Sequence, residues 1–262
     1  MKPAIMLLHG MFAGPGSWEA CGAWLQKEWP VYVPELPIFE TPYKKVGLNS
    51  LVDHIKRMLD DKEIERIVLG GNSLGGHVAL KLALAYPDRM AGLVLVGSSG
   101  LFDRTNQTTP IHPSREWVRK KMTEVFYDEA HVTEALVRKV HETISSPEQA
   151  RKVVRMARSA KHDNLREKLS HLSCPVMLIW GADDQITPLN VAFEFKRCLP
   201  HAEMELIERC GHAPNIERPR EVARIIGRFL VGHCSLQPAN GDHGSAALDS
   251  KTHPRLIDPA SV

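Results

Sequence analysis

Short apolar runs alternate along the chain with longer segments of helical periodicity. The apolar runs are rich in Val, Ile and Leu and nearly continuous in hydrophobicity, which is typical of strands buried on both faces of a parallel sheet. They lie at 4–8, 31–33, 66–70, 92–96, 176–180 and 204–207. The helical segments between them lie near 17–28, 49–61, 74–86, 189–198 and 218–231. This alternation predicts an α/β fold with a mostly parallel, doubly wound sheet of about six strands.

One interval, 101–171, breaks the alternation because it contains no convincing strand. Three helices are expected there instead, near 114–127, 130–144 and 147–161. Ser146 followed by Pro147 is a good start signal for the third. We interpret the interval as a helical cap inserted between two strands of a core made of 1–100 and 172–231. A separate helical domain is the alternative.

The last stretch, 232–262, is rich in Ser, Pro, Gly, Asn, Asp and His and has no periodicity. Such a segment cannot bury enough apolar surface to offset its ordering entropy, so a disordered tail is expected.

Composition narrows the class of protein further. The 262 residues are 43% hydrophobic and 24% charged, with a net charge of +2, which argues against a nucleic-acid partner. No early apolar run is long enough for a signal peptide or a membrane span. The five cysteines form no Cys-x-x-Cys pair, so no disulfide framework or metal site is indicated. We expect a reduced, cytoplasmic protein without a cofactor. A homodimer is compatible with the sequence, which does not fix the oligomeric state.

The strongest chemical signal is the motif Gly-Asn-Ser-Leu-Gly at 71–75, between a predicted strand and a predicted helix. A serine at such a sharp turn projects its hydroxyl above the sheet, and close packing leaves room only for glycine on either side. The motif therefore predicts Ser73 as a nucleophile, with the Leu74 N–H at the helix start as an oxyanion donor. The alternative is a glycine-rich turn with an incidental serine.

A serine nucleophile needs a base and an acid that orients the base. Two carboxylates, Asp183 and Asp184, follow the strand at 176–180, and His212 follows the strand at 204–207. The carboxyl ends of parallel strands share one edge of the sheet, where ligands bind. We therefore expect Asp184 and His212 beside Ser73. Asp183 is the first alternative for the acid and Asp103 a weaker one.

The other histidines that follow Asp184 in the sequence fit the role of base less well. His201 precedes its strand, and the remaining ones, His233, His243 and His253, fall in the expected tail. The second oxyanion donor is expected from the loop that starts at His9 and Gly10, with the Met11 N–H in that role. A flexible glycine-rich connector is the alternative for this loop.

These motifs together resemble the α/β-hydrolase family over about residues 3–231. The resemblance rests on His9-Gly10, on the motif at 71–76, on 180–188 and on Gly211-His212. It implies Ser73 as nucleophile, Asp184 as acid and His212 as base, and it implies that 101–171 is the lid of that fold.

Within the family, Asn72 and the segment 157–169 look like carbon–carbon bond hydrolases of aromatic meta-cleavage pathways. Those enzymes usually carry Trp after the catalytic His, where this chain has Ala213, and a richer glycine run where it has Met11 and Phe12. A general carboxylesterase is equally compatible.

The function expected from the sequence is cleavage of a small-molecule carboxylic ester or related acyl substrate through an acyl-enzyme on Ser73. A carbon–carbon hydrolase with the same triad and a non-catalytic binding protein on the same fold are the alternatives. Between Ser114 and Lys168 there are 13 Lys and Arg against 9 Asp and Glu. We favour solvated helix faces over a preference for anionic substrates as the explanation.

Overall fold

The computed structural model describes residues 2–101 and 114–234. In this part of the chain, six parallel strands form one sheet in the order β2-β1-β3-β4-β5-β6. The strands are β1 (Ala4–Leu8), β2 (Val31–Tyr32), β3 (Ile67–Asn72), β4 (Met90–Val96), β5 (Val176–Gly181) and β6 (Glu203–Ile207). The expected α/β-hydrolase architecture is confirmed, and every residue of β3, β4 and β5 is buried as their continuous hydrophobicity predicts.

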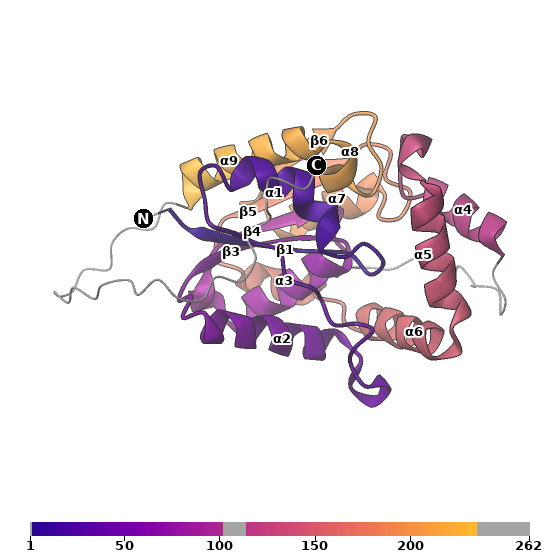
Figure 1. Cartoon of the computed structure of the whole chain (residues 1–262). Coiled ribbons are helices and arrows are strands. Elements are labelled where there is room, and N and C mark those ends of the chain that lie inside the picture. Colours follow the sequence, from indigo (N-terminus) through magenta and orange to yellow (C-terminus); the bar gives the residue numbers. More distant parts are fainter. Residues whose placement is uncertain (1, 102–113, 235–262) are drawn as a thin grey trace, which may run out of the picture.

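Helices cover both faces of the sheet, with α1 and α9 on one side and α2 and α3 on the other (Figure 1). The α-helices are α1 (Glu19–Leu25), α2 (Leu48–Asp61), α3 (Leu74–Ala85), α4 (Arg115–Thr123), α5 (Glu134–Ser145), α6 (Pro147–Lys161), α7 (Leu189–Cys198), α8 (Pro214–Glu217) and α9 (Pro219–His233). Short 3-10 helices are η1 (Pro15–Trp18), η2 (Tyr43–Lys45), η3 (Pro87–Arg89), η4 (Glu129–His131) and η5 (Arg166–His171).

Successive side chains of a strand enter different apolar cores because they point to opposite faces of the sheet. Met6 and Leu8 of β1 pack with residues of α2, α3 and α7, whereas Ile5 and Leu7 pack with residues of α1 and α9. The sheet is thus the middle layer of a three-layer fold.

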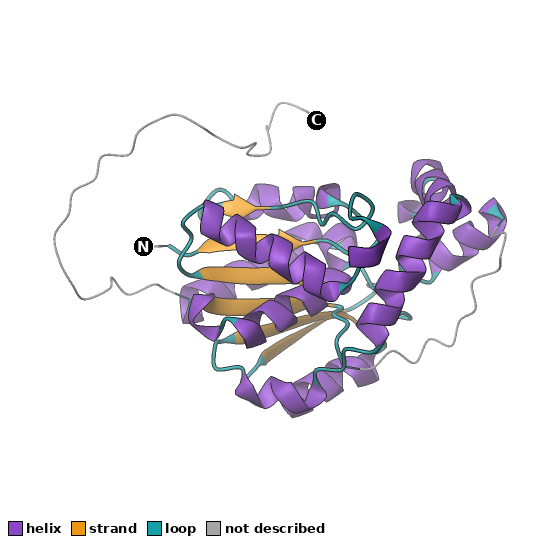
Figure 2. Cartoon of the chain, turned by 90° about the horizontal axis from the view of Figure 1, so that it is seen from below, coloured by secondary structure: helices purple, strands orange, loops and turns teal. Residues whose placement is uncertain are grey.

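The helices α4, α5 and α6, which we call the cap, group together beyond one end of the strands (Figure 2). Each begins at a side chain that accepts a hydrogen bond from the first turn: Ser114, Thr133 and Ser146. The expected start at Ser146 and Pro147 is confirmed.

Some element boundaries differ from the sequence prediction. Helix α4 ends at Thr123 rather than near 127, because residues 125–128 leave the helix to contact the core. The expected helix 17–28 is a 3-10 turn followed by the shorter α1. Helix α9 runs to His233, so Gly232 and His233 are helical and do not belong to a tail. The rest of the expected tail, from 235 on, lies outside the described residues.

The strand order reverses direction between β1 and β3, which makes their carboxyl ends the topological switch point of the sheet. β1 lies between β2 and β3, so the connections that leave β1 and β3 run toward opposite edges of the sheet. Ligands of open α/β sheets bind in the crevice at such a point. The loops that begin at His9 and at Ser73 start there. Among the described helices, none is long and apolar enough to cross a membrane.

Candidate active site

Ser73 occupies a strained turn between β3 and α3. Its φ of 55° and ψ of −117° are rarely adopted by a residue with a side chain, and such strain is concentrated at functional sites. The side chain is partly exposed, although the residues on either side of it are buried. A Cβ on Gly71 would overlap the main chain of Gly75, and one on Gly75 would overlap the carbonyl of Leu8. Both flanking glycines are therefore required by packing.

Asp184 and His212 form a buried pair at the carboxyl ends of β5 and β6. The Asp184 Oδ2 atom lies 2.9 Å from His212 Nδ1, and the two side chains are 0% and 7% exposed. The other carboxylate oxygen, Oδ1, accepts hydrogen bonds of 2.8 Å from the main-chain N–H groups of Ile186 and Thr187. Both oxygens of the Asp184 carboxylate are thus held by hydrogen bonds, and Oδ2 is the one that faces the imidazole.

The alternative acids do not occupy this place. Asp183 is exposed, and its main-chain N–H donates to the carbonyl of Cys210 at 2.9 Å. Asp103 lies outside the described residues. His201 is exposed and precedes β6, and His233 Nε2 contacts the Glu203 carboxylate on the surface. Among the described residues, the structure thus pairs the acid and histidine that the chain order indicated.

Thr187 is a polar neighbour of the pair that the sequence did not reveal. Its hydroxyl lies 2.9 Å from Asp184 Oδ2, 3.2 Å from His212 Nδ1 and 3.2 Å from the carbonyl of Gly97. Gly97 has a φ of 48°, and a Cβ there would come 2.9 Å from the carbonyl oxygen of His212. The signal available in the sequence was a threonine three residues after the candidate acid.

The turn at Ser73 and the loop that carries His212 are joined through Asn72. The Asn72 amide donates to the carbonyl of His212 at 2.9 Å and to that of Val96 at 3.0 Å. The residue before Ser73 therefore holds the main chain of His212. Among the described residues, no hydrogen bond joins the Ser73 hydroxyl to the imidazole. Catalytic hydrogen bonds of this kind commonly tighten only when substrate is bound.

The loop after β1 lies against the turn at Ser73. A Cβ on Gly10 would come 3.5 Å from Asn72 Oδ1 and 3.6 Å from Ser73 Cβ. Within the described part of the chain, neither the Met11 N–H nor the Leu74 N–H donates to a protein acceptor. The role of these two groups as oxyanion donors stays a prediction.

His9 fixes the peptide group that precedes Met11. This side chain is 2% exposed, and its Nε2 accepts the Leu36 N–H at 2.9 Å. Nδ1 therefore carries the ring proton of the neutral imidazole and donates it to the carbonyl of Gly10 at 2.7 Å. With the carbonyl held by His9, the N–H on the opposite side of the same peptide has a fixed direction.

An apolar cluster connects the cap to both loops of the site. It joins Phe12, next to Met11, and Ala213, next to His212, with side chains of the cap and of the segment after α4. Its buried members are Val118, Phe126, Val132, Val137, Val140 and Ala213, and the partly buried ones are Phe12, Trp117, Met122, Val125, Leu136, Ile144 and Ile216. Apolar packing therefore links the cap to the residues that follow Met11 and His212.

Several cations of the cap are bound by the protein itself. Lys152, which is 5% exposed, donates to the carbonyl of Phe39 at 2.6 Å and pairs with Glu148. Arg155 donates to the carbonyls of Val46 and Lys44. These contacts fasten α6 to the loop before α2, which accounts for part of the positive charge of this region.

The fold and these residues define a hydrolase of the α/β class, and the comparison with known families agrees. Residues 5–225 match the model of the alpha/beta hydrolase family. The chain belongs to this family.

Relatives and solved structures of similar sequence are hydrolases as well. The 2-hydroxy-6-oxononadienedioate/2-hydroxy-6-oxononatrienedioate hydrolase of Paraburkholderia phymatum is 28% identical over 253 residues, which cover 87% of each chain. An α/β-hydrolase enzyme from the metagenome of Mar Chica lagoon sediments is 29% identical, with a TM-score of 0.73 over 88% of this chain and 92% of that one. The meta-cleavage product hydrolase of Pseudomonas fluorescens IP01 is 25% identical, with a TM-score of 0.75 over 88% and 91%.

Proposed function

We propose that this hydrolase cleaves its substrate through a covalent acyl-enzyme on Ser73, with His212 as the base and Asp184 as the acid. The observation that carries the proposal is the buried 2.9 Å contact between Asp184 and His212, tied through Asn72 to a strained, partly exposed serine. A binding protein without catalysis has no need of this arrangement.

In the proposed first step, the Ser73 oxygen attacks the carbonyl carbon while His212 Nε2 takes the hydroxyl proton. Asp184 holds the Nδ1 proton and stabilises the charged imidazole. The N–H groups of Met11 and Leu74 bind the oxyanion, and each such donor contributes about 3 kcal/mol to stabilising the transition state. The proton then passes from His212 to the leaving group. In the second step, water activated by His212 releases the acid and restores Ser73.

We infer a carboxylic ester with apolar groups as the substrate. The proposal is supported by the apolar cluster of the cap, which includes Phe12 and Ala213, the residues that follow Met11 and His212. Apolar pockets bind acyl chains through burial, at about 25 cal/mol for each Å² removed from water. Lys152 and Arg155 hold main-chain carbonyls and so are engaged before any anionic substrate arrives.

A carbon–carbon hydrolase of the meta-cleavage type is the second candidate. It is favoured by the names of relatives at 27–28% identity, one of which acts on 2-hydroxy-6-oxo-6-phenylhexa-2,4-dienoate. Such substrates are vinylogous dioxo acids that carry a carboxylate. Turnover of that phenyl substrate, compared with p-nitrophenyl butyrate at equal enzyme concentration, separates the two candidates. A kcat/KM higher for the dioxo acid would assign the chain to the second class.

The test of the shared mechanism is Ser73→Ala, assayed with both substrates. We expect a loss of kcat on the order of 10⁴-fold or more, as for removal of a nucleophile that works with its base. Ser50→Ala on α2, whose hydroxyl donates to the Gly47 carbonyl, is the matched control and should keep full activity. Retention of half the activity by Ser73→Ala would exclude an acyl-enzyme on this residue.

A further inference from the structure

Glu217 is a buried carboxylate outside the proposed triad. It ends α8 and is 6% exposed. Its Oε1 accepts the Gly211 N–H at 2.7 Å and lies 3.8 Å from the Cys210 thiol. Its Oε2 accepts the N–H groups of Tyr127 and Asp128 at 2.8 and 3.1 Å. Every polar neighbour is thus a donor, and among the described residues no cation forms an ion pair with it.

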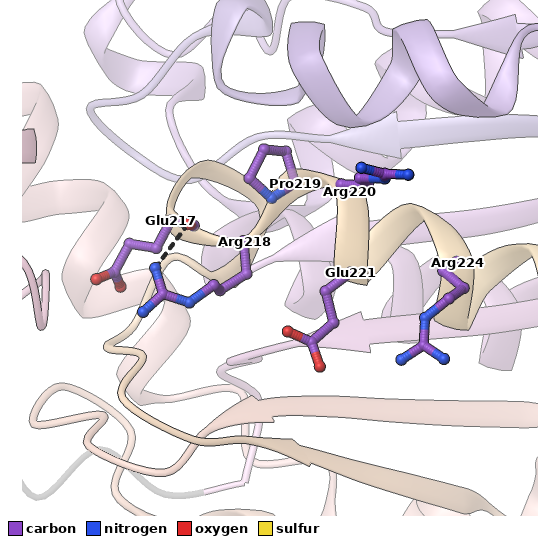
Figure 3. A pocket seen from close by; sticks show the side chains of 6 residues that line it. All are labelled: Glu217, Arg218, Pro219, Arg220, Glu221 and Arg224. Atoms are coloured by element: carbon purple, nitrogen blue, oxygen red, sulfur yellow. Dashed lines mark hydrogen bonds between the residues drawn. The ribbon is translucent and has the colours of Figure 1, made fainter.

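The carboxylate is directed away from the surface arginines that follow it. A pocket at the start of α9 is lined by Arg218, Arg220 and Arg224 (Figure 3). In this view the Glu217 carboxylate points away from Arg220 and Arg224, and the Arg218 guanidinium donates to the Glu217 carbonyl, at 3.0 Å. Glu217 borders this pocket, but its carboxylate oxygens accept hydrogen bonds from main-chain N–H groups of the interior.

The four groups that Glu217 binds belong to two segments far apart in the sequence. Cys210 and Gly211 form the turn before His212, whereas Tyr127 and Asp128 belong to the segment 125–128 after α4 of the cap. One carboxylate therefore holds segment 125–128 against the turn at 210–212, which contains the proposed base His212. The buried charge also contributes, after burial itself, to raising the pKa of the Cys210 thiol.

The clamped segment contacts His212 directly. The His212 N–H donates to the carbonyl of Val125 at 2.7 Å, while the His212 carbonyl accepts from Asn72. A Cβ on Gly211 would come 2.6 Å from the Val125 oxygen and 2.8 Å from the Tyr127 nitrogen. The main chain of His212 is therefore hydrogen-bonded to segment 125–128 on one side and to Asn72, next to Ser73, on the other.

We propose that Glu217 is a positioning residue that sets the place of His212 by fixing segment 125–128 against the turn at 210–212. The proposal rests on the proposed function of His212 as the base. Through this clamp, the position of the cap and the alignment of the base are coupled. A displacement of the segment moves His212 relative to Ser73 without any change in the triad itself.

The first test is Glu217→Gln, with p-nitrophenyl butyrate as substrate. An amide has the same shape but one oxygen, so in either orientation its NH₂ group meets N–H donors. We expect kcat to fall on the order of 10²-fold, because a displacement of about 1 Å in a catalytic group has that effect. KM should change by less than about threefold, since the binding surface is untouched. The rate at which a fluorophosphonate labels Ser73 should fall in parallel.

The control is Glu221→Gln, the same substitution four residues further along, where the carboxylate has no hydrogen bond or ion pair to the described residues. It should leave kcat, KM and the labelling rate unchanged. A folded Glu217→Gln protein with the kcat and labelling rate of the wild type would overturn the proposal. So would an effect confined to KM, because a misplaced base acts on the chemical step.

A second variant, Gly211→Ala, disturbs the contact between segment 125–128 and the turn at 210–212 while Glu217 stays unchanged. It tests the proposal even if Glu217→Gln does not fold. Its new methyl group pushes against the Val125 carbonyl and the Tyr127 amide. We expect the same fall in kcat at nearly constant KM. Gly232→Ala is the control, because a Cβ there meets no atom of the described residues within 4 Å. Wild-type kcat in folded Gly211→Ala protein would contradict the coupling.

The two proposals fail in distinguishable ways. If Ser73→Ala remains active, the proposed function is wrong whatever Glu217 does. If Ser73→Ala is inactive but both clamp variants are fully active, the triad stands and only the role of Glu217 is refuted.

Discussion

Replacing Asp184 by asparagine tests the geometry of the proposed triad, because the structure dictates how the amide must sit. Oδ1 of Asp184 accepts two main-chain N–H groups, those of Ile186 and Thr187. The amide oxygen has to take this place, since an NH₂ group there would face two donors. The NH₂ group then occupies the position of Oδ2 and points at His212 Nδ1. His212 must accept at Nδ1, so the proton of the neutral ring moves to Nε2.

This tautomer cannot take the proton of Ser73. The corresponding substitution in the serine protease triad lowers kcat about 10⁴-fold for this reason, which corresponds to about 5 kcal/mol in the activation barrier. The fold should suffer much less. Both main-chain donors keep an acceptor, so we expect a loss of about 1–2 kcal/mol in the free energy of unfolding, from the missing charge in these hydrogen bonds.

The assay is hydrolysis of p-nitrophenyl butyrate at saturating substrate, with folded protein verified by urea denaturation. Asp183→Asn is the matched control, because that neighbouring carboxylate is exposed and does not touch the histidine. It should retain activity within about twofold of the wild type. An Asp184→Asn enzyme that keeps more than a tenth of the wild-type kcat would refute the argument from tautomers.

Three further predictions concern packing, pH and thiol reactivity. Gly75→Ala should lower the free energy of unfolding by about 3 kcal/mol or prevent folding, because its Cβ would overlap the Leu8 carbonyl, whereas Gly16→Ala, with no atom within 4 Å, should melt in urea like the wild type. The hydrogen bond from His77, and next the one from Lys81, lower the pKa of Asp163 from 3.8 to about 2, so its stabilising effect is present above pH 3.8 and is lost as the pH falls toward 2. Asp163→Asn should therefore cost about 1 kcal/mol at pH 5 and clearly less at pH 2, and a constant difference in urea melts would contradict this. Iodoacetamide at neutral pH should modify Cys198 first, since the other cysteines are buried, and mass spectrometry showing earlier modification of any other would be inconsistent with the structure.

The sequence was sufficient to predict the sheet and the residues that meet at its edge. Continuous Val, Ile and Leu runs indicated buried parallel strands, and the motif at 71–75 identified the turn after β3. The pairing of Asp184 with His212 followed from the rule that all strands of a parallel sheet end at one edge. These features are local patterns or consequences of topology, so a single sequence can carry them.

The contacts of Thr187 and Glu217 could not be predicted in this way. Their partners are main-chain groups of loops, and Glu217 reaches a segment about 90 residues away in the sequence. A main-chain N–H has no sequence signature, so the choice of acceptor depends on the folded path of the chain. The boundary of α4 was wrong for the same reason, because segment 125–128 leaves the helix to meet this carboxylate.

The sequence pointed to the loop after β1 through His9 and Gly10, but it did not reveal the hydrogen bonds that hold this loop. The ring of His9 contacts the Gly10 carbonyl through Nδ1, while Nε2 faces the Leu36 N–H and the Glu35 carboxylate, both distant in the sequence. Such a tautomer assignment requires both partners to be placed in space.

The most direct test of the central claim is the site at which a fluorophosphonate reacts. Ser73 lies in the tryptic peptide 67–81, so a covalent adduct there is readily located by mass spectrometry. The account predicts one adduct on Ser73 that is formed rapidly by the wild type and on the order of 10³-fold more slowly by His212→Ala, because the serine is a weak nucleophile without its base. Labelling of another residue, or equally fast labelling of Ser73 in His212→Ala, would contradict it.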